Sequence, residues 1–343
     1  MIVVWAGFFL IIALLLAIDL GVVHKKSHAI TMPEAVRSSA VWITIGLSFS
    51  GLVYLIYEFH WGGIGSHGHV NGLQATSEYL TAYLVEKSLS VDNIFVIAML
   101  FRYFKVPALH QHRVLYWGIL GAIVFRGIMI AAGAALLEEF DWIFYVFGAI
   151  LVITAFRMIF GGEDEVDVEH SRIVRWVRKV LPISDKYDGQ RFTTRVDGRK
   201  MYTMLFLALI VIEMMDVVFA VDSIPAIFGF TQEPFIVMTS NIFAILGLRS
   251  LYFVVAGAMA QFRYLKLAVS VILLLVGIKM FIHDLVEVPA HWSLLVVILI
   301  LALGVFFSVA HNRRDERAAA LKPPDAPDQP PSAKDPTEPP SPS

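Results

Sequence analysis

Two short acidic sequences lie within apolar stretches of this chain, and they match each other when aligned. They are Glu86-Lys-Ser-Leu-Ser-Val-Asp92-Asn93 and Asp216-Val-Val-Phe-Ala-Val-Asp222-Ser223, so that Glu86 pairs with Asp216, Asp92 with Asp222 and Asn93 with Ser223. A carboxylate in a membrane span costs about 2.5–3.5 kcal/mol on insertion scales. Two matched sets therefore indicate a site that needs negatively charged oxygen atoms, and its natural occupant is a cation.

Further polar residues extend this candidate cation site. Asp92 and Asp222 are the leading ligands, and internal ion pairing with Arg126 or Arg249 is the alternative. Glu86, Asp216 and Glu213 follow, with proton carriage as their alternative use, and Glu213 shares a helix face with Asp216. Amide and hydroxyl groups at Asn93, Ser223 and Asn241 offer neutral oxygen atoms or hydrogen bonds between helices. The predicted metal-ligating residues are Asp92, Asp222, Glu86, Asp216, Glu213, Asn93 and Asn241.

Basic residues at membrane depth accompany these acids. We expect four of them to balance the carboxylates, because an uncompensated acidic cluster would take up protons; they are Lys87, Arg126, Arg249 and Lys279, and Arg157 is a further basic group. A sharper hypothesis is that one of them moves onto the carboxylates when the cation leaves. Asp19 is predicted with equal weight as a ligand for incoming cations or as an interfacial residue beside Lys25 and Lys26.

The composition places most of the chain in a membrane. Its 343 residues are 57% apolar, with a mean hydropathy of +0.70, whereas soluble domains are about 45–50% apolar. The chain contains no cysteine, which excludes disulfides, iron–sulfur clusters and thiolate metal sites. A metal would have to be bound by oxygen or imidazole. The first apolar run lacks a basic start and a cleavage site, so it is interpreted as a retained span.

Apolar runs of about 20 residues predict membrane helices. The nine predicted spans are Ile2–Val23, Val36–Tyr57, Glu78–Tyr103, His112–Leu137, Trp142–Phe160, Met201–Phe228, Phe235–Ala256, Tyr264–Ile282 and Trp292–Ala310. Lys and Arg occur in alternate loops, and such loops are cytoplasmic in membrane proteins. The alternation predicts an N-terminus outside the cell and a C-terminus in the cytoplasm.

The similarity of the two acidic sequences continues along the chain. The segment 153–159 aligns with 275–281, and Phe125-Arg126-Gly127 aligns with Leu248-Arg249-Ser250. The predicted fold is an all-α polytopic membrane protein with two three-helix repeats, spans three to five and six to eight. Because three is an odd number, the repeats are inverted, as in many transporters. The acids in each sequence are six residues apart, roughly 120° off a common face, which predicts a local helix break, and Pro225 is the candidate.

Domain boundaries follow from the spans, the charged loop and the composition. They are two N-terminal transmembrane helices with an outer loop (1–77), the first repeat (78–160), a cytoplasmic charged loop (161–200), the second repeat (201–284), a ninth transmembrane helix (285–311) and a disordered Pro-rich cytoplasmic tail (312–343).

In these segments the chain resembles the TerC/Alx family of bacterial integral membrane proteins, part of the broader LysE-like group of transporters. The resemblance is carried by 86–93, 213–225, 240–250 and 277–284, and it covers spans one to eight. It implies divalent-cation transport, chiefly manganese export, an association with tellurium resistance, and for some members the loading of metal onto exported proteins. The ninth span and the tail lie outside the recognised family core.

The predicted function is export of divalent metal cations by a secondary transporter that is not an enzyme and needs no cofactor. An all-oxygen site suits Mg²⁺, Ca²⁺ or Mn²⁺, and the family resemblance selects Mn²⁺ as the substrate, with Ca²⁺ second. Proton exchange is the expected driving force, because moving each charge costs ~2.3 kcal/mol per 100 mV and no P-loop sequence is present. The expected partners are metal ions, protons, the lipid bilayer and protein-export machinery, but no nucleic acid, at the bacterial cytoplasmic (inner) membrane.

Two other functions remain open at this point. A membrane scaffold could assist metal loading, membrane insertion or export of other proteins, with the charges serving structure. An amino-acid exporter is the second alternative, although it should need groups for a carboxylate and an amine rather than five acids. Two local patterns are interpreted mainly as solvated loops, with metal binding as the alternative: His67-Gly-His69 with nearby His60, and the acidic run 161–169.

Overall fold

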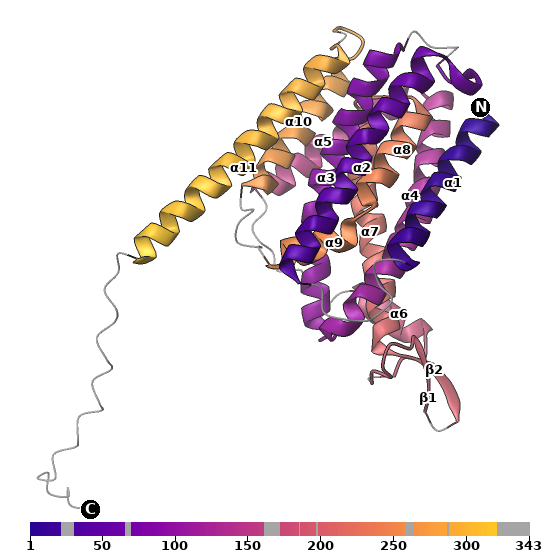
Figure 1. Ribbon diagram of the computed structural model, residues 1–343, viewed down its shortest axis with the longest axis vertical. Helices are drawn as coiled ribbons and strands as arrows, with labels where there is room; N and C mark the ends of the chain where they lie inside the picture. Colours follow the sequence, from indigo (N-terminus) through magenta and orange to yellow (C-terminus); the bar gives the residue numbers. More distant parts are fainter. Residues whose placement is uncertain are drawn as a thin grey trace, which may run out of the picture.

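The computed structural model describes residues 1–21, 31–65, 70–160, 172–184, 186–196, 198–257, 264–286 and 288–320. It is a bundle of long helices, with a small helix and a hairpin at the end opposite the N-terminus (Figure 1). The helices are α1 (Ile2–Gly21), α2 (Met32–Glu58), α3 (Gly72–Tyr103), α4 (Ala108–Glu139), α5 (Trp142–Phe160), α6 (Arg172–Val180), α7 (Met204–Phe228), α8 (Pro234–Ile245), α9 (Leu248–Gly257), α10 (Leu265–Phe281) and α11 (Ala290–Ala320), with a 3₁₀ turn at Trp61–Gly63.

The chain is an all-α polytopic membrane protein. Six described helices are long and apolar enough to cross a membrane, namely α1, α2, α4, α5, α7 and α11, and the bent pair α8–α9 makes up to seven. The remaining two predicted spans correspond to α3, whose apolar sequence is interrupted by charged residues, and to α10, which is 17 residues long. The count of nine spans therefore stays a prediction.

Packing partners of the two predicted repeats exchange in a regular way. Helix α3 packs on α8, α4 on α7, and α5 on α10. In the predicted alignment of the repeats, α3 corresponds to α7, α4 to the pair α8–α9, and α5 to α10. The α3–α8 contact is then equivalent to the α4–α7 contact, and the α5–α10 contact joins two equivalent helices. At that third contact the backbones approach closely, because a Cβ on Gly277 would lie 2.9 Å from the carbonyl oxygen of Gly148. This pattern agrees with a twofold relation, and the inverted repeat stays a prediction.

Buried apolar side chains form two large clusters toward opposite ends of the bundle. One contains the first part of α3, up to Tyr83, with α1, α2 and α8. The other contains α3 from Val91 onward, with the beginnings of α4 and α7 and part of α9. The segment of α3 that carries Glu86 lies between the two clusters, so the fold positions this carboxylate near the middle of the bundle.

The predicted break at Pro225 is wrong, and the break lies in the next span instead. Helix α7 continues through Pro225, whereas the predicted span Phe235–Ala256 is divided into α8 and α9, whose axes differ by 47°. Gly247 lies at the break with φ +79°, and a Cβ there would lie 2.5 Å from Cβ of Trp42. Both the left-handed backbone and the close approach of α2 require glycine.

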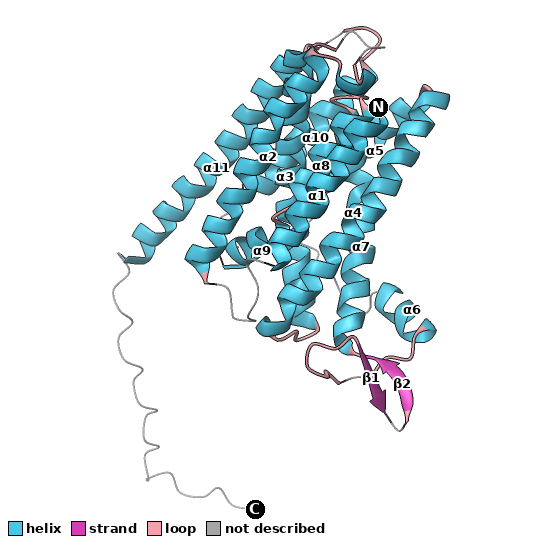
Figure 2. Ribbon diagram, turned by 45° about the vertical axis from the view of Figure 1, so that its right-hand side comes forward, coloured by secondary structure: helices cyan, strands magenta, loops and turns pink. Residues whose placement is uncertain are grey.

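The predicted charged loop 161–200 is partly folded. It contains α6, and an antiparallel hairpin of β1 (Thr193–Val196) and β2 (Arg199–Tyr202) in which Thr193 pairs with Tyr202. The Tyr187 hydroxyl donates a hydrogen bond of 2.5 Å to the carbonyl oxygen of Phe104, and burial raises the pKa of Tyr187. This bond ties the segment to the end of α3. Figure 2 shows the hairpin at the same end of the bundle as α6.

Candidate functional site

Arg126 on α4 joins one carboxylate from each acidic sequence. Its Nε and Nη2 donate to the two carboxylate oxygens of Asp216 on α7, at 3.1 and 2.9 Å, and its Nη1 donates to Oε1 of Glu86 on α3. The exposed fractions of the three side chains are 2% for Arg126, 0% for Glu86 and 17% for Asp216. The site is therefore a buried ion triad with one bidentate guanidinium–carboxylate pair.

Two carboxylate oxygens, one in this triad and one beside it, have no hydrogen-bond partner among the described residues. They are Oε2 of Glu86 and Oε2 of Glu213, and both are buried. The Glu213 carboxylate lies against α4 at Gly121, so close that a Cβ there would be 2.2 Å from Oε1. The Ser223 hydroxyl lies 3.4 Å from Nη1 of Arg126. Buried polar atoms are almost always paired in folded proteins, so these two oxygens are exceptions that lie in or next to the triad.

Asp92 and Asp222 lie away from the triad. The Asp222 carboxylate accepts a hydrogen bond of 2.6 Å from Thr154 on α5 and interacts electrostatically with Arg157. The basic group that acts on Asp92 is Lys266 of α10. Because α3 and α7 are both continuous helices, acids six residues apart on them face different neighbours. The structure thus brings Glu86 and Asp216 together and leaves the other two acids separate.

The two outlying acids lie on opposite sides of the triad along the bundle. Helix α7 begins at the end of the bundle where α3 finishes, so the two helices are antiparallel (Figure 1). A displacement of six residues corresponds to about 9 Å along a helix axis. Asp92 is therefore displaced toward the α6 end, and Asp222 toward the opposite end. The four acids form a row along the bundle with the Arg126 pair in the middle.

The other predicted charge-balancing residues have different partners. Nζ of Lys87 donates to the carbonyl oxygens of Ala244 and Leu246, at 2.9 and 3.3 Å, and thereby caps α8 at the break. It is also close enough to Glu86 to interact electrostatically. Nζ of Lys279 lies 5.6 Å from the ring centroid of Phe230.

Arg249 forms an ion pair that sequence reasoning missed. Its Nη2 lies 2.8 Å from Oδ1 of Asp19 on α1. Asp19 is thus tied to the second repeat by the residue aligned with Arg126. The sequence offered one signal for this pair, because Asp19 and Arg249 are an acid and a base at membrane depth. No spacing rule linked them.

The remaining predicted ligands are buried, but no shared metal cluster forms. Asn93 and Asn241 are both buried, and neither polar side-chain atom of Asn241 has a hydrogen-bond partner. Within the described ranges there is no group of three or more His, Asp or Glu arranged to hold a metal ion. His60 lies in the described part of its loop, whereas His67, His69, the acidic run 161–169 and the tail after 320 lie outside it.

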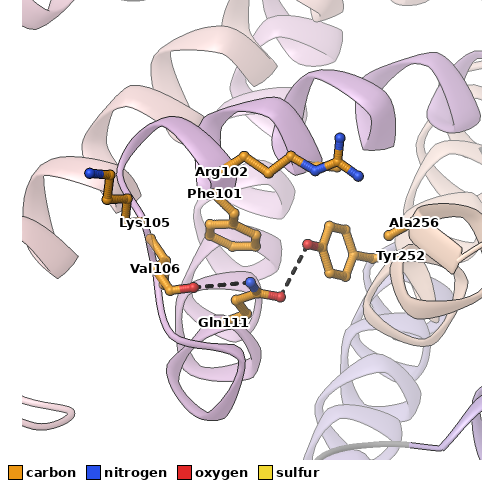
Figure 3. A pocket seen from close by; sticks show the side chains of 8 residues that line it. Phe101, Arg102, Lys105, Val106, Gln111, Tyr252 and Ala256 are labelled. Atoms are coloured by element: carbon orange, nitrogen blue, oxygen red, sulfur yellow. Dashed lines mark hydrogen bonds between the residues drawn. The ribbon is translucent and has the colours of Figure 1, made fainter. Parts of the chain in front are cut away.

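Two cavities lie at opposite ends of α3. One, of about 600 Å³, lies at its beginning and is lined by Glu78, Phe230, Lys279, His283 and His291 among others. The second, of about 330 Å³, lies at its end and is lined by Arg102, Lys105, Gln111 and Tyr252. In Figure 3 the Tyr252 hydroxyl donates to Gln111, which in turn donates to the Val106 carbonyl oxygen. Neither cavity contains the Arg126 triad.

The sequence that forms this bundle matches a known family of membrane proteins. Residues 71–316 match the family model described as "Integral membrane protein TerC family", and the chain belongs to this family. The match begins near the start of α3 and includes α11, so the expectation that the ninth span lies outside the family core is wrong. The match leaves out α1 and α2.

Curated relatives cover almost the whole chain. This chain is 45% identical over 309 residues to "Uncharacterized membrane protein STKORF319" of Myxococcus xanthus, and the match covers 90% of this chain and 92% of the relative. It is 45% identical over 314 residues to "Putative membrane-bound redox modulator Alx" of Escherichia coli K12, covering 91% and 96%. An uncharacterized membrane protein of Rickettsia bellii is 40% identical over 313 residues, covering 91% and 99%. No solved structure matches the chain.

Proposed function

We propose that this protein is a secondary transporter that exports divalent metal cations, with Mn²⁺ as the first candidate substrate, in exchange for protons. The observation that supports this most is the buried triad of Glu86, Arg126 and Asp216. It joins the two acidic sequences through a single guanidinium. Two carboxylates match the charge of one divalent cation, and carboxylate oxygens are ligands that Mn²⁺ accepts.

In this proposal the cation and Arg126 compete for the same carboxylates. A buried carboxylate without a counter-charge is strongly unfavourable, so Arg126 returns to Glu86 and Asp216 when the cation leaves. The partnerless oxygens of Glu86 and Glu213 supply further ligand atoms during occupation. No group in the described residues is arranged for metal binding while Arg126 holds the acids. Cation binding therefore requires a side-chain rearrangement.

Asp92 and Asp222 act in this proposal as successive ligands on either side of the triad. Their displacement along antiparallel helices, about 9 Å each, gives a cation one carboxylate on each side of the central pair. Protons travel in the opposite sense, because a carboxylate that releases a metal ion becomes free to bind a proton. Export of a divalent cation against the membrane potential then draws on the proton gradient.

The name of the Alx relatives raises a redox role. This chain contains no cysteine, so a thiol–disulfide exchange by its own residues is excluded. The proposal of ion movement rests instead on the ionic groups that α3, α4 and α7 bring together.

Transport by the purified protein in liposomes tests the proposal. The liposomes contain a pH-sensitive dye and a manganese indicator, and Mn²⁺, Ca²⁺, Mg²⁺ and Zn²⁺ are compared. We expect Mn²⁺ movement coupled to proton movement in the opposite direction, and its loss in Asp92→Asn and Asp222→Asn, which keep the side-chain size. Normal Mn²⁺ transport by both variants, or no transport of any cation by the unmodified protein, would contradict the proposal.

The proposed orientation is an N-terminus outside the inner membrane and a C-terminus in the cytoplasm. It rests on the alternation of Lys and Arg between loops. A reporter enzyme fused within 58–77 should score as extracytoplasmic, and one fused within 161–200 as cytoplasmic. The opposite result would contradict this orientation.

A further inference from the structure

The apolar face of helix α6 is wider than its buried contact, and its outer edge remains exposed. Val174 and Val177 are buried in the cluster that contains the first turn of α7. Trp176 and Val180, four residues apart at the outer edge of that face, are both 57% exposed. Packing on α7 therefore leaves these two apolar side chains uncovered.

The remaining surface of α6 is basic. Arg175 and Lys179 are exposed and also lie four residues apart, so they form a stripe beside the Trp176–Val180 edge. Arg178 lies on the α7 side, where it donates to the sulfur of Met204 at 3.5 Å. The helix thus combines an anchored apolar face, the exposed aromatic and aliphatic edge of that face, and a basic face, which is the pattern of helices that lie in a membrane interface.

The position of α6 fits this pattern. Figures 1 and 2 place it at the end of the bundle opposite the N-terminus, beside the start of α7, with the hairpin beyond it. The start of a spanning helix lies at the boundary of the hydrocarbon core, and tryptophan is enriched at that level. Arg and Lys at the same level attract anionic headgroups.

We propose that α6 is an interfacial anchor that binds the anionic phospholipid surface at its own end of the bundle. Trp176 and Val180 enter the headgroup–acyl boundary, and Arg175 and Lys179 contact lipid phosphates. This binding does not depend on the transported substrate, so it stands or falls separately from the proposed function.

The absence of cysteine allows a direct test by spin labelling of the full-length protein. A nitroxide is attached to Val180→Cys, which keeps Trp176, and to Val196→Cys on the hairpin as the matched control. Each protein is reconstituted into phosphatidylcholine vesicles with or without phosphatidylglycerol. Collisions with oxygen report immersion in lipid, and collisions with a water-soluble nickel chelate report exposure to water.

We expect the label at 180 to collide mainly with oxygen and the label at 196 mainly with the nickel chelate. Immersion at 180 should be deeper when phosphatidylglycerol is present. Combining Arg175→Gln and Lys179→Gln should remove that lipid dependence, whereas Arg195→Gln with Lys200→Gln should not. Equal exposure of both labels to nickel would overturn the anchor. Immersion that ignores phosphatidylglycerol would overturn the anionic-lipid assignment, and dipolar broadening between labels at 180 would indicate a second copy of the chain instead.

Discussion

The two arginines that occupy aligned positions in the predicted repeats have opposite roles. Arg126 lies in the unbroken helix α4 and reaches the centre of the bundle, where it holds Glu86 and Asp216. Arg249 lies just after the break between α8 and α9 and pairs with Asp19 of α1, away from the acids of the triad. The break redirects the second arginine, so only the first repeat supplies a guanidinium to the acids in the described structure. Similar sequences therefore produce one central counter-ion and one structural clamp.

The broken helix is itself held by residues outside its own repeat. Gly247 gives the left-handed turn, Trp42 of α2 packs against it, and Lys87 of α3 binds the carbonyl oxygens that the break leaves free. Lys87 follows Glu86 directly in the sequence. One turn of α3 thus connects the acidic centre with the end of α8.

The largest expected loss of stability is at Arg126, and comparison with Arg249 tests the division of roles. Arg126→Gln leaves two buried carboxylates without their counter-ion and should lower the unfolding free energy by about 3–5 kcal/mol. Arg249→Gln should cost about 1–3 kcal/mol, because it leaves one carboxylate, Asp19, without its counter-ion rather than two. Unfolding in detergent measures both values, and an equal or larger loss for Arg249→Gln would contradict the division of roles.

A smaller effect is expected at the helix break. Gly247→Ala adds a Cβ against Trp42 in a left-handed conformation and should cost about 2–4 kcal/mol. Gly127→Ala, next to the aligned arginine in α4, is the control. Its added Cβ would lie 4.0 Å from Met238, so it should be neutral or gain up to about 1 kcal/mol from helix propensity. Similar losses for the two variants would show that the break needs no glycine.

The capping role of Lys87 predicts the smallest of these stability effects. Lys87→Met keeps an unbranched side chain but leaves the carbonyl oxygens of Ala244 and Leu246 unpaired, at a cost of about 1–3 kcal/mol. Lys105→Met, at an exposed position after α3, should stay within about 0.5 kcal/mol of the unmodified protein. Hydrogen exchange should be faster around 244–247 in Lys87→Met, and unchanged exchange there would argue against capping.

Much of the fold follows from apolar run lengths. The span Trp142–Phe160 agrees with α5 at both ends, because apolar sequence and helix coincide there. The hairpin after α6 was missed, although Asp197-Gly198 between two short runs is a hairpin signal and Gly198 has φ +77°. The break at Gly247 was missed because Pro225 looked like the stronger breaker, but neighbouring helices support α7 through the proline.

The sequence predicted which acids lie in the site, but only part of how they are grouped. The aligned pairs Glu86 with Asp216 and Asp92 with Asp222 came from sequence alone. Which pair is central depends on where Arg126 arrives from α4, and helix packing decides that. The Asp19–Arg249 contact joins residues 230 positions apart, a separation over which no spacing rule applies.

The central claim is that a cation binds where Arg126 now holds Glu86 and Asp216, and Mn²⁺ binding to the purified protein tests it most directly. The electron paramagnetic resonance signal of free Mn²⁺ falls as the ion binds, which gives the affinity without transport. We expect Glu86→Gln and Asp216→Asn each to weaken binding at least tenfold, about 1.4 kcal/mol. The control Asp19→Asn, which removes the carboxylate paired with Arg249, should leave binding unchanged. Unaltered affinity in both central variants, or an equal loss in Asp19→Asn, would contradict the account.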